Sequence, residues 1–389
     1  MLPTSFVHRS AATRLVLRDG AIDDLRVELG ALGIRRPLLL GSARMQRSAL
    51  FARVVLALGD LPHTLAEPVP AHSSVSLVER LAAEAKATGI DGFIAVGGGS
   101  ASDTAKAIAL LMAEGGRLAD HAVRFTPPAT LIAPQLLAPK LPIVAIPGTA
   151  SGAEVTASLG VRDADGAKLL FTDIQLAARL VLIDPHANLE MPAALMCATG
   201  MNGLAHCIEG LYSRERSPLA ETLALDAMAR FAEALPAVHR APQDAAARAA
   251  LLYAAHLSGL VLVNARTCLH HAICHAICHA IGSVTGVGHG NANAVMLPHV
   301  IAFNAPVAEQ PLARAALAMG VGDDAAALVQ AVYALQTAIG VPARLRDIGV
   351  PPDALDRIAD KTLRERGLYY NPRAVAEARD VRELLDAAY

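Results

Sequence analysis

The chain changes character near residue 184, and this change limits what it can fold into. Before that point, four short apolar runs of strand length are separated by helical patterns: 36–41, 92–96, 141–147 and 178–184. Strands that alternate with helices indicate a largely parallel sheet with helices on both faces. After residue 184 strand patterns nearly vanish, and long Ala/Leu-rich segments indicate a helical bundle.

We therefore predict two domains. An α/β domain would span residues 1–184, and an all-α helical domain would span residues 185–389. A length of 389 residues is long for one hydrophobic core, which also favours two domains. A ligand is expected in the cleft between them.

Charge and aromatic content argue against several classes of partner. The formal net charge is −2, aromatic residues make up 3% of the chain, and it contains no Trp. Nucleic acids and anionic membranes are bound by basic surfaces and stacking side chains, which this composition does not supply. No uninterrupted apolar run is long enough to cross a bilayer. We expect a cytoplasmic protein with a small-molecule substrate and no nucleic-acid or membrane partner.

The five cysteines all lie in the C-terminal half. Their odd number and the lack of a secretory leader favour reduced thiols. Cys274 and Cys278 stand between histidines, where they are either soft metal ligands or small core residues. We favour the core role.

A glycine-rich turn is the first candidate site. Gly97, Gly98, Gly99 and Ser100 follow a predicted strand and open a predicted helix. Glycine lets the backbone approach a phosphate, and a helix N-terminus offers free N–H groups. We predict a pyrophosphate cradle, with an ordinary serine-capped turn as the alternative.

Two further turns follow predicted strands. The segment 147–156 combines hydroxyls with bare backbone, which suits a nicotinamide ribose or a diphosphate, although an ordinary capped turn fits equally well. The first predicted strand ends at Gly41 and Ser42, without the acidic residue that would bind a ribose 2′-OH. Arg44 is nearby. Either NADH or NADPH is therefore permitted.

Histidines crowd one helical segment. His271, His275 and His279 recur every fourth residue with Ala and Ile between them, so their rings project from nearly one face into the protein interior. His289 follows ten residues later. Buried imidazoles each need a polar partner or a metal. This segment is where we expect the chemistry.

Asn202 and His206 lie four residues apart in another predicted helix and face the same way. A single histidine is more often a satisfied core residue. A second histidine-bearing helix favours a shared site, because side chains from two helices of a bundle can meet at one point.

Four motifs, in this order, resemble the iron-containing (group III) alcohol dehydrogenase family: GGGSASDTAK, IPGTASGAEVT, TGMNGLAHCIEGLYS and HAICHAIGSVTGVGHGNANAVMLPHVIAFN. Within the family the chain looks most like the maleylacetate reductase branch. Three features support this: Asn202 where metal-dependent members carry Asp, the adjacent His270 and His271, and the ending YYNPRAV…VRELLDAAY.

The resemblance implies a dehydroquinate synthase-like fold with an N-terminal dinucleotide-binding domain, and a homodimer that uses NADH or NADPH. It implies hydride transfer to the enone or carbonyl of a small anionic substrate, in aromatic-compound catabolism. The cofactor-binding candidates are Gly41, Ser42, Gly97, Gly98, Gly99, Ser100, Asp103, Lys106, Gly148, Thr149, Ser151 and Val155.

The resemblance also implies a ligand set for Fe²⁺ or Zn²⁺. The candidates are Asn202, His206, His275 and His289, with His271 as the alternative to His275. The alternatives arise because HAIC occurs twice: counting back from His289 selects His275, whereas counting forward from His270 selects His271. We favour His275, because the short segment between His279 and His289 leaves less room for slippage.

An amide at position 202 removes a negative charge and coordinates a metal weakly. We therefore expect reduction without a metal, in which histidines stabilise the enolate and one of them delivers the proton. The catalytic candidates are His206, His275, His279 and His289. Arg266 and Lys106 are candidate anchors for the anionic substrate, with surface or capping roles as the alternative.

Three alternatives remain. The first is a metal-dependent alcohol dehydrogenase or aldehyde reductase. The second is a sugar-phosphate cyclase, a lyase of similar fold. The third is an inactive relative that acts through protein interactions.

Overall fold

The computed structural model describes residues 5–127, 130–285 and 288–389. The chain forms two compact units. One contains Ser10–Arg124 and Leu131–Met191, and the other contains Met1–Arg9, Phe125–Thr130 and Pro192–Tyr389. The main division lies between Met191 and Pro192, a short way after the boundary that we predict from the sequence.

The first unit is built on a parallel sheet of six strands in the order β1-β10-β7-β4-β2-β3. The strands are β1 (Arg14–Leu17), β2 (Pro37–Leu40), β3 (Thr64–Leu65), β4 (Gly92–Gly97), β7 (Ile143–Pro147) and β10 (Leu180–Ile183). The four central strands are those predicted from apolar runs. The two edge strands, β1 and β3, are short and partly exposed, so the sequence gives them no comparable apolar signal.

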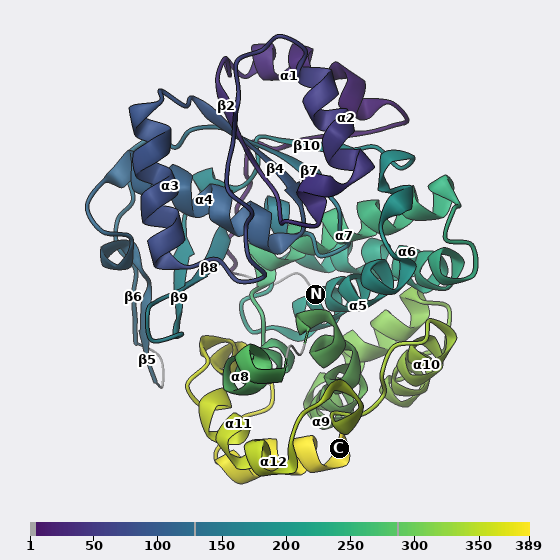
Figure 1. Ribbon diagram of the computed structural model, residues 1–389. Helices are drawn as coiled ribbons and strands as arrows, with labels where there is room; N and C mark the ends of the chain where they lie inside the picture. Colours follow the sequence, from purple (N-terminus) through teal and green to yellow (C-terminus); the bar gives the residue numbers. More distant parts are fainter. Residues whose placement is uncertain (1–4, 128–129, 286–287) are drawn as a thin grey trace. The chain divides into compact units, whose positions relative to one another are not determined.

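Helices cover both faces of this sheet, as the alternating pattern predicts. They are α1 (Leu25–Ala31), α2 (Ala49–Leu58), α3 (Val75–Ala87) and α4 (Gly99–Glu114). Figure 1 shows α3 and α4 on one side of the sheet, and α1 and α2 on the other. Ser48 and Ser74 cap α2 and α3 with their hydroxyls. Two small two-stranded sheets complete the elements: β5 (Arg124–Thr126) with β6 (Thr130–Ile132), and β8 (Ser158–Arg162) with β9 (Lys168–Thr172).

The strand order reverses between β2 and β4. From β2 the chain moves outward to β3, then returns to place β4 on the other side of β2. The loops that leave the carboxyl ends of β2 and β4 therefore run in opposite directions. In open parallel sheets this reversal point is where nucleotides bind.

The second unit is helical. It contains α5 (Ala193–Tyr212), α6 (Pro218–Arg240), α7 (Ala245–Ala265), α8 (Leu269–Thr285), α9 (His289–Ala318), α10 (Ala325–Ala338), α11 (Leu355–Thr362) and α12 (Ala378–Ala387). Glycines on α5 allow its neighbours to approach closely. A Cβ on Gly203 would lie 2.5 Å from the ring of Phe231 on α6, and one on Gly210 would collide with Val261 on α7. This packing holds α5 rigidly in place.

Helix α7 corrects one expectation from the sequence. By length and composition it is apolar enough to cross a membrane, with 61% of its most apolar window buried inside the unit. It packs against both α5 and α6. A buried apolar helix of this kind is typical of a soluble protein's core.

Candidate functional site

The glycine turn lies at the carboxyl end of β4. Gly97 adopts a φ of 125°, a conformation that favours glycine. Gly98 is the N-cap of α4 and makes no side-chain cap hydrogen bond. The 16-residue helix α4 therefore begins with an uncapped N-terminus at the reversal point of the sheet. Such an end binds anions through its N–H groups and dipole.

The other two predicted turns lie beside the first. Gly148 donates its N–H to the carbonyl of Gly97 at 2.8 Å. A Cβ on Gly98 would lie 3.1 Å from Cγ2 of Thr149. Gly41 directly follows the neighbouring strand β2, and the hydroxyl of Ser42 accepts a hydrogen bond from the N–H of Met45. The structure thus brings the predicted glycine, serine and threonine candidates to one edge of the sheet. The feature among them that suits a dinucleotide pyrophosphate is the uncapped N-terminus of α4.

Three of the predicted cofactor-binding residues have structural roles within the protein rather than contacts suited to a cofactor. Nζ of Lys106 donates to the carbonyls of Ala153 (2.6 Å) and Thr156 (2.9 Å). Asp103 accepts from the N–H of Gly160 at 3.2 Å, and Val155 is fully buried. Burial lowers the pKa of Lys106. Lys106 therefore clamps the 153–158 segment onto α4, which contradicts its predicted use as a substrate anchor.

In the helical unit, an amide links two imidazoles. Nδ2 of Asn202 lies 3.3 Å from Nε2 of His206, and Oδ1 of Asn202 lies 3.2 Å from Nε2 of His271. The rings of His206 and His271 stack with centroids 4.7 Å apart. All three residues are buried. Helices α5 and α8 thus meet through the residues that the sequence singled out.

The amide geometry indicates which nitrogen of His206 carries its proton. An N–H of Asn202 donates to Nε2 of His206, so a neutral His206 carries its proton on Nδ1. That buried Nδ1 has no hydrogen-bond partner in the part of the chain that the structure describes. Burial holds the pKa of His206 well below its ordinary value, and His271 lowers it further, so the ring is neutral at pH 7. His206 therefore presents a buried donor that is available to a ligand oxygen.

Glu209 is a site residue that the sequence analysis missed. Its Oε2 lies 2.6 Å from Nδ1 of His271, and its Oε1 accepts from the N–H of His270 at 2.8 Å. Burial raises the pKa of Glu209 above its ordinary value, although His270 and backbone N–H donors act in the opposite direction. The signal was present: Glu209 is a carboxylate inside an apolar helix, seven residues after Asn202 on the same face.

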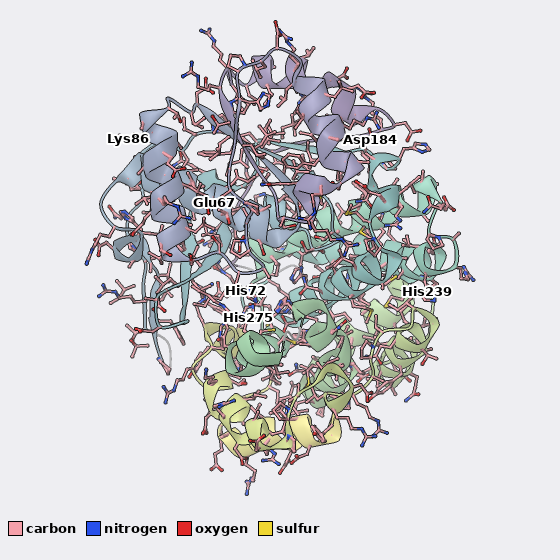
Figure 2. The ribbon with its side chains drawn as sticks, in the orientation of Figure 1. Glu67, His72, Lys86, Asp184, His239 and His275 are labelled. Carbon is pink, nitrogen blue, oxygen red and sulfur yellow. The ribbon has the colours of Figure 1, made fainter. Side chains whose placement is uncertain are left out.

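His275, His279 and His289 form a second group beside the first. The ring of His275 lies 5.4 Å from that of His289, 6.0 Å from that of His279 and 6.2 Å from that of His271. Nδ1 of His275 and Nδ1 of His279 both face Glu365, a second residue that the sequence analysis missed. Figure 2 marks His275 on α8. Burial raises the pKa of Glu365, but hydrogen bonds with the two histidines outweigh it and lower the pKa below its ordinary range.

The structure therefore favours His271 over His275 as the partner of Asn202. Oδ1 of Asn202 faces His271, which is the residue that the forward count from His270 selects. The assignment of His275 as a metal ligand, from the count back from His289, stays a prediction. His275 remains in the cluster, 5.4 Å from His289, but it faces Glu365.

The described side chains do not fit a resident divalent cation. The Asn202 amide lies 3.3 Å from Nε2 of His206 and 3.2 Å from Nε2 of His271, so it fills the space in which an ion would have to contact both nitrogens. Among the described residues, no three His, Cys, Asp or Glu side chains are arranged to hold an ion.

Comparison with known proteins now identifies the family. The profile described as iron-containing alcohol dehydrogenase matches residues 12–185, and that of the C-terminal part of the Fe-containing family matches residues 196–389. The chain is an iron-containing alcohol dehydrogenase by family. It is therefore an oxidoreductase, in a family that uses NAD(P)H with iron.

Several family members resemble this one along their whole length. A 4-hydroxybutyrate dehydrogenase of Cupriavidus necator is 32% identical, covering 96% of this chain and 97% of its own. A maleylacetate reductase of Pseudomonas sp. (strain P51) is 31% identical, covering 99% and 98%. The crystal structure of maleylacetate reductase from Agrobacterium tumefaciens has a TM-score of 0.83 at 30% identity, covering 100% and 99%.

Proposed function

We propose that this iron-containing alcohol dehydrogenase relative is an NAD(P)H-dependent reductase of the maleylacetate reductase type. It reduces the enone or carbonyl of a small anionic substrate in aromatic-compound catabolism, without a resident metal. The observation that carries the proposal is the position of the buried Asn202. Its amide contacts Nε2 of both His206 and His271, the nitrogens that a metal at this site would need as ligands. Relatives named for maleylacetate and 4-hydroxybutyrate, both carboxylates, support an anionic substrate.

The glycine turn is proposed to bind the cofactor. The open N-terminus of α4 holds the pyrophosphate, and Gly98, Gly148 and Gly41 keep side chains out of its way. When bound, the nicotinamide supplies the hydride. Ser42 stands at the end of β2 without a neighbouring acid, so both NADH and NADPH are accepted.

The histidine cluster is proposed to stabilise the charge that develops on the substrate. Hydride addition to an enone places negative charge on the carbonyl oxygen. The Nδ1–H of neutral His206 donates to that oxygen, and Glu209 holds His271 in the orientation that locks the Asn202 amide. His279, with its side chain 21% exposed, takes up a second proton from solvent on Nε2 and delivers that proton to complete the reduction.

Arg266 is proposed to anchor a substrate carboxylate. Arg266 precedes His271 by five residues, and the sequence predicts both on one helix. In the structure α7 ends at Ala265 and α8 begins at Leu269, so Arg266 lies in the connection between the two helices. Its φ of 69° is strained for a residue other than glycine. Burial lowers its pKa, and the charges of Arg366 and Arg9 lower it further. Nothing within the described ranges pairs with its guanidinium through an ion pair. Strain and clustered positive charge are both typical of an anion site.

Replacing Arg266 with glutamine is expected to raise KM for the anionic substrate by about 10- to 100-fold, the loss of one charge-assisted hydrogen bond. The value of kcat should change less than KM. Steady-state kinetics measures both. Arg240→Gln, an exposed arginine at the end of α6, is the matched control and should behave as the wild type. An unchanged KM for Arg266→Gln would remove the anchor role.

The function is tested by following NADH and NADPH oxidation by chelator-treated protein. The substrates are maleylacetate and a panel of short aldehydes, each with and without added Fe²⁺ or Zn²⁺. We expect turnover of maleylacetate that added metal does not change. Inert maleylacetate, together with aldehydes that turn over only with metal, would contradict the proposal.

A metal-dependent alcohol dehydrogenase or aldehyde reductase is the second candidate. It is favoured by the 32% identity to a 4-hydroxybutyrate dehydrogenase. Stoichiometric metal in the purified protein, with activity lost to a chelator, would support it. We also propose a homodimer in the cytoplasm, which size-exclusion chromatography with light scattering and cell fractionation would test.

A further inference from the structure

The carboxylate of Glu365 contacts two histidines of the repeated motif at once. Its Oε2 lies 3.6 Å from Nδ1 of His275, and its Oε1 lies 3.4 Å from Nδ1 of His279. The three side chains have similar exposures of 19%, 23% and 21%. One carboxylate therefore spans adjacent turns of α8, with one oxygen for each ring.

The repeat produces the spacing that Glu365 requires. HAIC at 271–274 and again at 275–278 places His275 and His279 four residues apart, so their rings lie one above the other. The rings stack with centroids 6.0 Å apart and planes 20° apart. The ring of His289 stacks on the other side of His275, with centroids 5.4 Å apart and planes 22° apart. Three imidazoles thus form a column, and Glu365 holds two of them.

The segment that carries Glu365 is fixed against α8. A Cβ on Gly367 would lie 2.9 Å from the carbonyl of Cys268, so the backbone packs directly on the residues that precede α8. Sγ of Cys268 donates to the carbonyl of Tyr370 at 3.4 Å. On the other side of Glu365, Nζ of Lys361 reaches the carbonyl of His279 at 3.4 Å. Contacts on both sides of Glu365 keep its carboxylate at a set distance from the column.

We infer that Glu365 is a positioning residue, whose carboxylate attracts the Nδ1–H groups of His275 and His279 and thereby fixes both rings for the reaction. A carboxylate at Nδ1 keeps the proton there and directs Nε2 away from itself. Glu209 makes the same contact with Nδ1 of His271. Glu209 thus orients His271, and Glu365 orients His275 and His279. The inference deepens the proposed function and rests on it.

The test compares Glu365→Gln, Glu365→Ala and Glu365→Asp with the wild type. We expect kcat to fall about 10- to 100-fold in the Gln and Ala variants, as on loss of an orienting partner, with partial recovery in Asp. KM and the affinity for NAD(P)H should stay within about twofold. Glu383→Gln on α12, an exposed carboxylate outside the site, is the control and should match the wild type.

A second readout does not depend on activity. In ¹⁵N-histidine-labelled protein, His275 and His279 should each show a protonated Nδ1, with signals assigned through His275→Gln and His279→Gln. Glu365→Gln is nearly isosteric and should redistribute that proton between Nδ1 and Nε2. Unchanged proton positions together with wild-type kcat would overturn the inference. If no substrate in the panel is reduced, the proposed function fails, and the proton positions alone decide the role of Glu365.

Discussion

Replacing His206 with alanine is expected to lower kcat by about 100- to 1000-fold, the usual cost of losing one oxyanion donor. The ring is neutral, 6% exposed, and carries a buried Nδ1–H without a described partner. Removing it also leaves the Nδ2 of Asn202 without its acceptor. The Kd for NADH or NADPH should not change, because the proposed nucleotide-binding residues belong to the other compact unit.

Turnover and nucleotide affinity are measured on the same preparations, by NAD(P)H oxidation and by fluorescence titration. His239→Ala is the matched control, because His239 is exposed at the end of α6 (Figure 2) and should retain full activity. Unchanged turnover in His206→Ala would remove this residue from the mechanism. A large loss of nucleotide affinity would contradict the proposal that nucleotide binding depends on residues of the other unit and not on His206.

Replacing Gly98 with valine is expected to raise the Kd for NADH and NADPH by at least about tenfold. The first added carbon already lies 3.1 Å from Cγ2 and 3.2 Å from Oγ1 of Thr149. The branched side chain must push the 147–156 loop away or occupy the space in front of α4. Either change spoils the proposed pyrophosphate cradle.

The control for Gly98→Val is Gly30→Ala. Gly30 lies on α1, and a Cβ there meets nothing within 4 Å, so the variant should bind nucleotide as the wild type does. Circular dichroism and the melting temperature check that Gly98→Val still folds. A folded Gly98→Val protein with unchanged Kd for both nucleotides would place the pyrophosphate elsewhere.

The sequence was informative where residue pattern alone determines local structure. Four buried strands, the change to helices, and the glycine turn before α4 all follow from periodicity and turn chemistry. The sequence shows no uninterrupted apolar run of membrane length, yet by length and composition α7 is apolar enough to cross a membrane, because a few polar residues do not prevent a helix from being apolar overall. Lys106 looked like a free cation in sequence, but three-dimensional packing gives its ammonium group backbone carbonyls as partners.

The histidine cluster marks the limit of sequence reasoning. Periodicity placed His271, His275 and His279 on one face but could not show where a four-residue repeat is absorbed, because four residues nearly complete a helical turn. Glu209 and Glu365 each reach the cluster through contacts between segments distant in sequence. Periodicity within one helix carries no information about such contacts.

The central claim is that this protein transfers hydride from NAD(P)H to an enone without a resident metal. The most direct measurement is a single turnover of chelated protein with maleylacetate and NADH or NADPH deuterated at C4, followed by mass spectrometry of the product. The account predicts the saturated 3-oxo acid carrying one deuterium, with no metal detected in the protein. Absence of the deuterated product unless Fe²⁺ or Zn²⁺ is restored would contradict it.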